Sequence, residues 1–418
     1  MNQESSTAHW GFKNIGFRFG FVYLVLYTFP FPLTYIPGVY WLLGWYRNSS
    51  EWLVNNVGEH IFGVTEMSSA PTGSGDKMYD FMFMATCFIV AIIAAVIWSV
   101  LDRKRPNYEK LWLYLHTWLR YYLACFLLSY GFSKVFVLQF SELSLFDLVK
   151  TYGDSSPMAL AWNFMEYSDS YTIFTGIGEV LGGLLLLFRR TLILGCIVTI
   201  AVMATVVMIN FSFDVPVKLF SSHLLLIAFV LLIPDYKRLI KLFFLNKTVP
   251  PAEKATYFKN PSYNIAANVV KGLFIAYVLI LQTSNSISGQ KQYGKKAEKP
   301  ALYGIYKTVH FVVNKDTIAP LTTDAERWNK LIIGKRSAGV QFMNNSLEYY
   351  NQEFLSDTIK LQGYEKFILT FIENEKFLIL DGSRNSDTVH IKLRKIDHTQ
   401  MNLLRRGFNW VNEVPFNR

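Results

Sequence analysis

The sequence is short of charged residues, because only 17% of its 418 residues are Asp, Glu, Lys or Arg, against roughly a quarter in an ordinary soluble domain. Hydrophobic residues make up 51%, and this balance favours a chain embedded in lipid. The net charge of +10 does not indicate nucleic-acid binding, because Lys and Arg gather in short clusters between apolar runs and form no single basic face.

Cysteine is also scarce. Cys87, Cys125 and Cys196 lie far apart inside apolar stretches, so the sequence offers neither a CxxC redox pair nor a zinc framework. The C-terminal part lacks a glycine-rich phosphate loop and the ligand spacing of a calcium loop. Residues 1–10 are polar and lack the features of a cleaved signal peptide, so we expect the first apolar run to act as an uncleaved anchor.

What the sequence does contain is a series of apolar runs of membrane-spanning length, for which about 20 residues are needed. There are seven of them, at 15–33, 79–101, 111–138, 171–188, 191–211, 220–234 and 266–283. A proline-rich region with Pro30, Pro32 and Pro37 should end the first helix. The sequence therefore predicts a bundle of about seven transmembrane helices.

Basic residues fall in every second connection between these runs. They are Lys13, Arg18, Arg103, Lys104, Arg105, Lys110, Arg189, Arg190, Lys237, Arg238, Lys241 and Lys247. Because Lys and Arg next to spans stay in the cytoplasm, the pattern places the N-terminus inside and the chain after residue 284 outside. The alternate connections, 35–78, 139–170 and 212–219, are acidic or mixed. The first of them carries Trp41, Trp45 and Trp52, which is typical of a helix in the membrane interface.

From residue 290 onward the pattern changes to short alternating runs rich in β-branched and aromatic residues. These runs are 305–313, 340–343, 367–372, 377–380 and 388–396, separated by Gly, Asn and Asp. They predict an antiparallel β-sandwich or small barrel, with turns at 373–375 and 381–383. About 130 residues are enough for an independent core.

Ionisable residues inside the predicted spans are functional candidates, because a charge in a bilayer is costly. In the third run, His116 and Lys134 share one helical angle and Arg120 lies about 40° away, which makes one polar stripe. In the fourth run, Glu179 should lie only about 7 Å from Arg120 along the membrane normal, with Lys134 also within reach. We therefore expect Glu179 to be paired.

Three more residues, Asn210, Asp214 and His223, fall at a similar depth and could extend this pair into a cluster. A single ion pair can also simply hold a bundle together, and a lone histidine is more often a hydrogen-bonded core residue than a ligand or proton carrier. His116 near the inner surface and His223 near the outer one cannot share an iron. Close helix packing is expected at small residues, namely Gly131, Gly182 and Gly183.

Residues 120–134, with Arg120, Gly131 and Lys134, resemble the first core helix of DoxX-like membrane proteins, and 176–190, with Glu179, resemble the second. The closing stretch, 403–418, is similar to the ends of DoxX-like proteins from Bacteroidota that carry an added external domain. The resemblance covers roughly 111–234. It implies a four-helix core in the bacterial inner (cytoplasmic) membrane, a periplasmic C-terminal domain and, by association with thiosulfate:quinone oxidoreductase, a quinone-linked role.

The predicted domains are 1–110 with two spans, the core at 111–235, a connection and seventh span at 236–289, and the external β domain at 290–418. Two functions remain open. One is a membrane scaffold or envelope-complex subunit whose external domain binds a protein partner. The other is a quinone-interacting subunit of a membrane oxidoreductase, with quinone near Arg120, Lys134 and Glu179 and protons moved by Glu179 or His223. The sequence assigns no catalytic residue and no metal site, and it indicates the lipid bilayer and a protein as partners.

Overall fold

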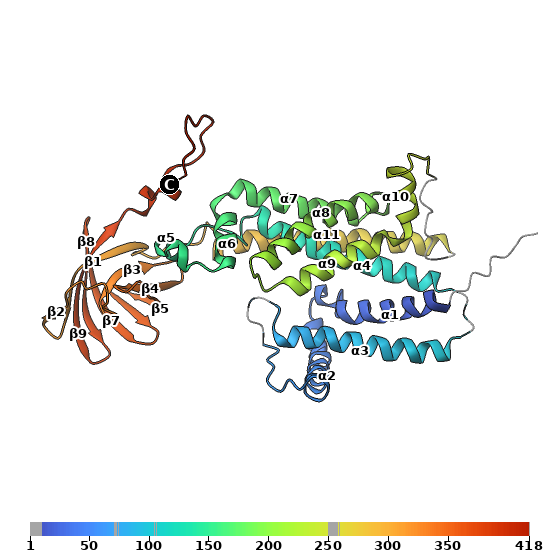
Figure 1. Ribbon diagram of the computed structural model, residues 1–418, viewed down its shortest axis with the longest axis horizontal. Coiled ribbons are helices and arrows are strands. Elements are labelled where there is room, and N and C mark those ends of the chain that lie inside the picture. Colours follow the sequence, from blue (N-terminus) through green and yellow to red (C-terminus); the bar gives the residue numbers. More distant parts are fainter. Residues whose placement is uncertain are drawn as a thin grey trace, which may run out of the picture. The chain divides into compact units, whose positions relative to one another are not determined.

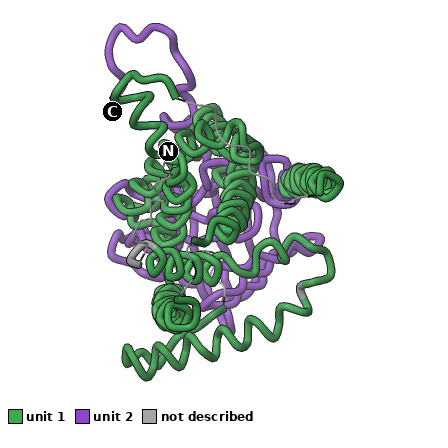
Figure 2. The backbone as a smooth tube through the Cα atoms, turned by 90° about the vertical axis from the view of Figure 1, so that its right-hand side faces the viewer, with its two compact units in different colours: residues 1–140, 157–289 green, residues 141–156, 290–418 purple. Residues whose placement is uncertain are grey.

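The computed structural model describes residues 11–417, apart from 71, 72, 74, 104, 106, 250–257 and 259. Residues 1–10, interpreted above as lacking a cleaved signal peptide, and the basic residue Lys104 lie outside this described part. The chain forms two compact units (Figure 2). One comprises 1–140 and 157–289 and is helical, and the other comprises 141–156 and 290–418 and contains the β-strands.

The helical unit contains one helix for each of the seven predicted apolar runs. These helices are α1 (Gly11–Thr28), α3 (Met78–Leu101), α4 (Glu109–Val135), α7 (Asp169–Leu186), α8 (Leu192–Ser212), α9 (Lys218–Leu232) and α11 (Pro261–Gln292). Three further helices join them, namely α2 (Gly44–Phe62), α6 (Pro157–Tyr167) and α10 (Tyr236–Phe243). The helix positions are thus confirmed, and α1 ends at Thr28, just before the proline-rich region.

Within the described residues, five helical stretches are long and apolar enough to cross a membrane. They are Asn14–Tyr35, Met78–Leu101, Arg189–Ser212, Lys218–Phe243 and Pro261–Gln292. The count of seven spans is therefore only partly supported. Helices α4 and α7 fall short because α4 carries His116, Arg120 and Lys134, while α7 carries Glu179 and several glycines.

Four helices of this unit form a closed ring. Helix α4 packs against α7, α7 against α8 and α8 against α9, and α9 returns to α4. Outside the ring, α1 packs against α3 and α4, and α2 lies crosswise to α3 (Figure 1). The ring is the observed form of the predicted four-helix core.

The start of α9 depends on a residue far away in the sequence. Both carboxylate oxygens of Asp76 accept backbone N–H groups, from Lys218 at 2.6 Å and from Leu219 at 3.0 Å. The first N–H groups of a helix have no partner within the helix, so an acceptor there stabilises the helix start. The loop before α3 is thereby fixed to the ring.

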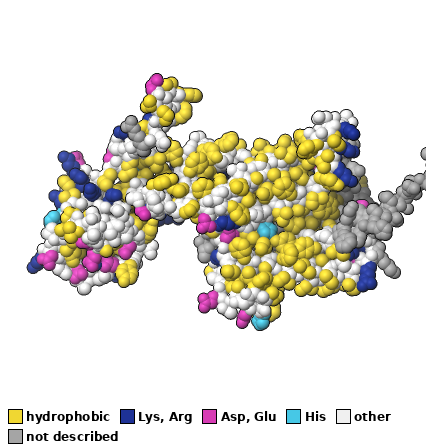
Figure 3. Space-filling model, in the orientation of Figure 1, with side chains coloured by type: hydrophobic (Ala, Val, Ile, Leu, Met, Phe, Trp, Pro, Cys, Tyr) yellow, Lys and Arg dark blue, Asp and Glu magenta, His cyan; other side chains and the backbone are white. Residues whose placement is uncertain are grey.

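The two ends of the helical unit differ in charge (Figure 3). The connections at one end carry described Lys and Arg residues of the clusters found in the sequence, namely Arg103, Arg105, Arg189, Arg190, Lys237, Arg238, Lys241 and Lys247. The opposite end carries acidic residues, including Glu51, Asp76, Asp80 and Asp214. Between the ends, hydrophobic side chains cover much of the visible outer surface (Figure 3).

The second unit is an eight-stranded antiparallel barrel with one short additional strand. The strands are β1 (Gly304–Val313), β2 (Asp316–Thr317), β3 (Trp328–Ile333), β4 (Ser337–Phe342), β5 (Leu347–Leu355), β6 (Thr358–Gln362), β7 (Lys366–Glu373), β8 (Phe377–Arg384) and β9 (Asp387–Ile396). From β3 to β9 each strand pairs with the next, and β1 pairs with both β3 and β9, which closes the barrel. Large side chains such as Tyr306, Trp328 and Phe367 fill its core.

The predicted β domain is thus a barrel, and the five predicted runs lie in β1, β4, β7, β8 and β9. The turn near 373–375 is confirmed, but the predicted turn at 381–383 is wrong because these residues belong to β8, where Gly382 pairs with Leu369. A Cβ atom at Gly382 would collide with the backbone oxygen of Ile368. This glycine therefore permits close strand approach, and the turn falls at Asn385, whose φ is 52°.

Residues 141–156 also correct the predicted domain boundaries, which placed them in the 111–235 core. They belong to the barrel unit. Their helix α5 (Leu145–Val149) packs Leu145 and Val149 against Ile305 and Ile332, on β1 and β3. These two isoleucines are fully buried, so α5 covers part of the barrel wall.

Candidate functional site

The helical unit contains a buried ion pair between α4 and α7. The Nζ atom of Lys134 lies 2.5 Å from Oε1 of Glu179, and the two side chains are only 9% and 3% exposed. The second carboxylate oxygen, Oε2, is buried without a hydrogen-bond partner in the described part of the chain. Leaving a buried acceptor unpaired is unfavourable, so a donor brought by a bound molecule would stabilise it.

Glycines determine how this pair forms. A Cβ atom on Gly131 of α4 would lie 2.8 Å from the backbone nitrogen of Val180, and one on Gly176 of α7 would lie 2.8 Å from that of Val135. The two helices therefore touch through their backbones at this crossing. Because Val180 and Gly176 both contact Gly131, Glu179 lies at the level of Gly131 and next to Lys134.

Arg120 does not take part in this pair, which corrects the predicted spacing. It lies eleven residues before Gly131 on α4, a rise of about 16 Å at 1.5 Å per residue, and not the expected 7 Å from Glu179. Its guanidinium lies over the Tyr121 ring, with 5.1 Å to the ring centroid, and NH2 contacts the Tyr121 hydroxyl at 3.4 Å. The predicted stripe is buried along its length, but its three members contact different partners.

The other predicted packing glycines also lie at helix contacts. A Cβ atom on Gly183 would lie 3.1 Å from the Ala124 oxygen on α4, and one on Gly182 would lie 2.9 Å from Oγ1 of Thr199 on α8. Sequence reasoning missed Gly195 of α8, where a Cβ atom would lie 2.9 Å from the Leu186 nitrogen. Its position within the apolar run 191–211 was the signal that the sequence offered.

A cavity of about 780 Å³ opens onto the ion pair. Helices α3, α4, α6, α7, α8 and α9 and the loop before α3 contribute to its wall. Its polar lining includes Lys134, Glu179, Asn210, Ser221, Gln139 and Asp80, and its apolar lining includes Leu127, Trp162, Met203, Phe220 and Leu224. This volume lies within the usual range for small-ligand sites, roughly 300–1,000 Å³. Apolar walls with a few polar groups suit an amphipathic molecule.

Of the three residues expected to extend the cluster, only Asn210 lines the cavity. Its Nδ2 donates to Oγ of Ser221 at 3.0 Å and so joins α8 to α9. The Asp214 side chain is 85% exposed and pairs with Lys218 at 2.8 Å. Asp214 follows the end of α8 and points into solvent, so its expected place in the cluster is wrong.

His223 lies outside the cavity lining and has partners for both ring nitrogens. Nδ1 lies 2.8 Å from the Leu219 carbonyl oxygen, to which only an N–H can donate, so Nε2 accepts from the Tyr23 hydroxyl at 2.6 Å in the neutral ring. The ring also stacks on Tyr27, with 3.8 Å between centroids. This is a hydrogen-bonded core histidine, and the expected cluster does not reach it.

His116 lies at the other end of α9. Its Nε2 is 3.1 Å from the Leu231 oxygen, whereas His223 contacts Leu219, twelve residues earlier on the same helix. The two histidines are therefore about 18 Å apart along α9. In the described ranges, no group of three or more His, Cys, Asp or Glu residues could hold a metal ion.

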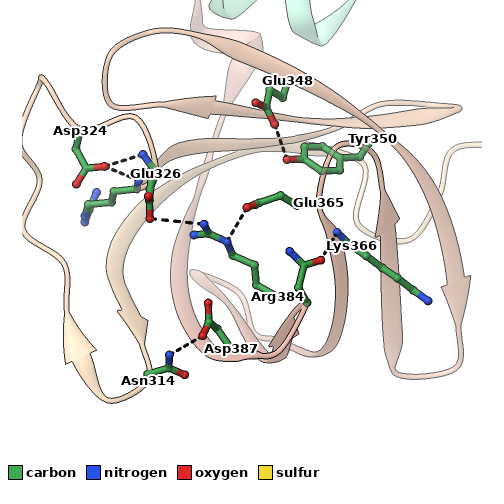
Figure 4. A network of polar contacts seen from close by, with 11 residues as sticks. Asn314, Asp324, Glu326, Glu348, Tyr350, Glu365, Lys366, Arg384 and Asp387 are labelled. Atoms are coloured by element: carbon green, nitrogen blue, oxygen red, sulfur yellow. Dashed lines mark hydrogen bonds and ion pairs between the residues drawn. The ribbon is translucent and has the colours of Figure 1, made fainter.

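The barrel has a second polar cluster, around its β7–β8–β9 rim (Figure 4). Arg384 Nε lies 2.9 Å from Glu365 and its NH2 lies 3.5 Å from Glu326. Nearby, Asn314 donates to Asp387 at 2.7 Å. These groups satisfy one another and connect neighbouring loops, so we interpret this cluster as structural and the cavity as the candidate site.

Comparison with known proteins gives one informative similarity. The uncharacterized protein YwoB of Bacillus subtilis (strain 168) is 33% identical to this chain over 124 residues, which are 30% of this chain and 79% of YwoB. YwoB is therefore much shorter than 418 residues and has no room for both units. No family model matches the chain, and no solved structure matches it.

Proposed function

This chain belongs to the family of YwoB, and we propose that it is a multi-pass protein of the bacterial inner membrane with a cytoplasmic N-terminus and a periplasmic barrel. Support comes from five apolar helical stretches and from the basic and acidic ends of the helical unit (Figure 3). Lys and Arg at the basic end would face the cytoplasm. The amphipathic helix α10 at that end, with Lys237, Lys241 and exposed Phe243, would lie along the inner surface.

A reporter enzyme that is active only outside the cytoplasm tests this orientation when fused to the C-terminus. A matched fusion after Lys247, in the basic connection, serves as the control. We expect activity from the first fusion and none from the second. Activity from the second fusion alone would reverse the orientation.

We further propose that the protein is a DoxX-like membrane scaffold or envelope-complex subunit, whose barrel binds a protein partner outside the cytoplasm. The observation that carries this proposal is the filled barrel. Tyr306, Trp328 and Phe367 occupy its core, so its interaction groups lie on the outer wall and the loops. A closed barrel with a packed interior suits a rigid binding module better than a ligand carrier.

Chemical crosslinking followed by co-purification tests the scaffold proposal. The full chain is compared with one that ends at residue 289, and the melting of the helical unit is followed as a control for folding. A second variant retains the barrel but replaces two exposed side chains, Ile372→Ser and Tyr364→Ser, which are 65% and 95% exposed. We expect the truncated chain to lose a periplasmic partner. An unchanged partner list would contradict a recruiting barrel.

The cavity favours a second candidate function, a quinone-interacting subunit of a membrane oxidoreductase. A quinone head at the ion pair could accept a hydrogen bond from Lys134, whose positive charge would stabilise the negative charge gained on reduction. Glu179 is placed to exchange a proton with the same head. A partner subunit would supply the electrons. Arg120 and His223, included in the sequence-based version of this hypothesis, have no part in it because neither lines the cavity.

Extraction of bound quinone from protein purified in mild detergent tests this candidate. The comparison is between wild type, Glu179→Gln in the cavity wall and the matched control Asp214→Asn, which removes a carboxylate outside the cavity. We expect quinone in wild type and the control, with a loss of about tenfold in Glu179→Gln, because the variant removes the carboxylate that holds the Lys134 ammonium in place to donate to the head. Quinone-supplemented wild type that retains none would eliminate this candidate.

A further inference from the structure

The chain enters and leaves the barrel at the same end. Ile305, at the start of β1, pairs with Ile396, the last residue of β9. The apolar helix α11 ends at Gln292, so residues 293–303 alone connect it to β1. Eleven residues reach at most about 40 Å. The barrel end that carries the C-terminal tail is therefore the end to which this short connection from α11 is joined.

The tail, residues 402–417, exposes large apolar side chains. Phe408, Trp410, Val411 and Val414 are between 71% and 91% exposed. The tail begins with the short helix α12 (Asn402–Arg405) and then projects away from the strands (Figure 1). Such a concentration of exposed aromatic and aliphatic groups marks an interaction surface.

Positive charge surrounds this surface. The barrel end joined to α11 carries Lys291, Lys295, Lys296, Lys299, Lys335, Arg336, Lys395, Arg405 and Arg406. Its acidic residues are fewer, namely Glu142, Glu298, Asp357, Glu373, Glu375 and Asp397, and two of them already pair with Lys335 and Lys395. The excess charge is complementary to an anionic surface.

We propose that the tail lies in the headgroup region of an anionic bilayer on the side where α11 emerges. This inference rests on the proposed membrane insertion of α11. Tryptophan prefers the membrane interface, where its apolar ring and polar N–H are both satisfied, and Arg405 and Arg406 supply the charge for lipid phosphates. The tail would then hold the membrane-proximal barrel end against the lipid, in addition to the connection through α11.

Fluorescence quenching in the full-length protein tests the proposal. Val411→Cys is labelled with a polarity-sensitive dye, which is selective because the native Cys87, Cys125 and Cys196 are buried. The protein is reconstituted into vesicles of phosphatidylethanolamine with about one third phosphatidylglycerol, containing doxyl-labelled lipid as the quencher. The matched control is Tyr364→Cys, 95% exposed in the turn between β6 and β7 at the opposite barrel end.

We expect the dye at 411 to be quenched at least about twofold more than the dye at 364, since only the tail enters the interface. Phosphatidylethanolamine vesicles without the anionic lipid, or the pair Arg405→Gln and Arg406→Gln, should reduce that difference by about half or more. Equal quenching at both positions would overturn the proposal. It would also be overturned if the quenching at 411 were unchanged both without the anionic lipid and in the variant that lacks the two arginines. Shielding at 411 that requires another protein would assign the tail to a protein partner. The reporter fusions above test the orientation separately, so failure of either claim is distinguishable.

Discussion

The two units of this chain distribute polar and apolar groups in opposite ways. In the helical unit the apolar side chains of α3, such as Ile93, Val96 and Leu101, are 54–80% exposed, whereas Lys134 and Glu179 are buried. In the barrel the large apolar side chains are inside. In water an exposed apolar band is unfavourable, but in lipid it has no such cost, and polar groups must then be satisfied inside the protein. The difference supports the proposal that the helical unit lies in lipid and the barrel in water.

The ion pairs of the two units also differ in their exposure to solvent. The helical unit buries Lys134 and Glu179 together, whereas in the barrel Lys395 and Glu373 form a pair with side chains 47% and 33% exposed. Breaking a buried pair leaves an uncompensated charge, while solvent screens an exposed pair. The same chemical change should therefore have unequal effects in the two units.

The largest effect is expected from Lys134→Met, which leaves Glu179 without its partner. We expect it to lower the free energy of unfolding of the helical unit by about 3–5 kcal/mol, measured by thermal melting in detergent. The matched change in the barrel, Lys395→Met, should cost less than about 1 kcal/mol. Equal losses in the two units would contradict the expected difference between the buried and the exposed pair. The double variant Lys134→Met with Glu179→Leu should recover most of the stability.

The next effect concerns the glycine contact that sets the level of the ion pair. Gly131→Leu would push α4 away from Val180 and Gly176, and overpacking of this kind costs about 1–3 kcal/mol or more. Gly272→Leu on α11 is the matched control, because a Cβ atom there has nothing within 4 Å. Melting in detergent should separate the two variants, and equal midpoints would contradict the close crossing.

A smaller effect is expected at the start of α9. Asp76→Ala removes the acceptor for the N–H groups of Lys218 and Leu219, which should cost about 1 kcal/mol. Asp76→Asn retains one acceptor oxygen and should lose less. Hydrogen exchange of the amides at 218 and 219 provides the readout, and unchanged protection in Asp76→Ala would show that the loop does not cap this helix.

These contacts also show what a sequence can predict. The helices were found because an apolar run carries its own signal, and α3 was expected at 79–101 and observed at Met78–Leu101. The level of Glu179 was misplaced because it depends on where Gly131 meets Gly176 on another helix. No property of either segment alone fixes that crossing.

In the barrel, too, the sequence predicted some elements and not others. Strand β5, Leu347–Leu355, was missed because polar residues interrupt the apolar pattern on both faces, with Glu348 on the face of the buried Tyr350 and Asn351 and Glu353 on the outward face. The place of α5 depends on Leu145 meeting Ile305, 160 residues later in the chain. Local strand signals therefore predict a β domain, but not its full strand count or the segment that packs on its wall.

The smallest effect concerns pH. Burial raises the pKa of the Asp147 carboxyl, more than the nearby Lys150 lowers it. The pKa of this carboxyl is therefore higher in the folded than in the unfolded protein, where it is near 4. Below the unfolded pKa the carboxyl is protonated in both states, so its burial does not oppose folding. As pH rises through the folded pKa, the folded protein must bury a charge and loses that stability. Asp147→Asn should therefore stabilise the barrel unit at neutral pH by less than about 0.5 kcal/mol, given solvent screening, with no gain at low pH.

Denaturant unfolding of the full chain at several pH values, with hydrogen exchange of β1 and β3 as the local readout, measures this change. A gain that is equally large at low and neutral pH would show that the carboxyl charge is not its cause.

The proposal that the helical unit crosses the membrane and the barrel lies outside the cytoplasm is tested most directly by cysteine labelling in spheroplasts. Tyr364→Cys in the barrel and Lys241→Cys in α10 are both exposed, and the three native cysteines are buried. With a membrane-impermeant maleimide, this account predicts labelling at 364 in intact spheroplasts and at 241 only after permeabilisation. Labelling of both positions before permeabilisation, or of 241 alone, would contradict it.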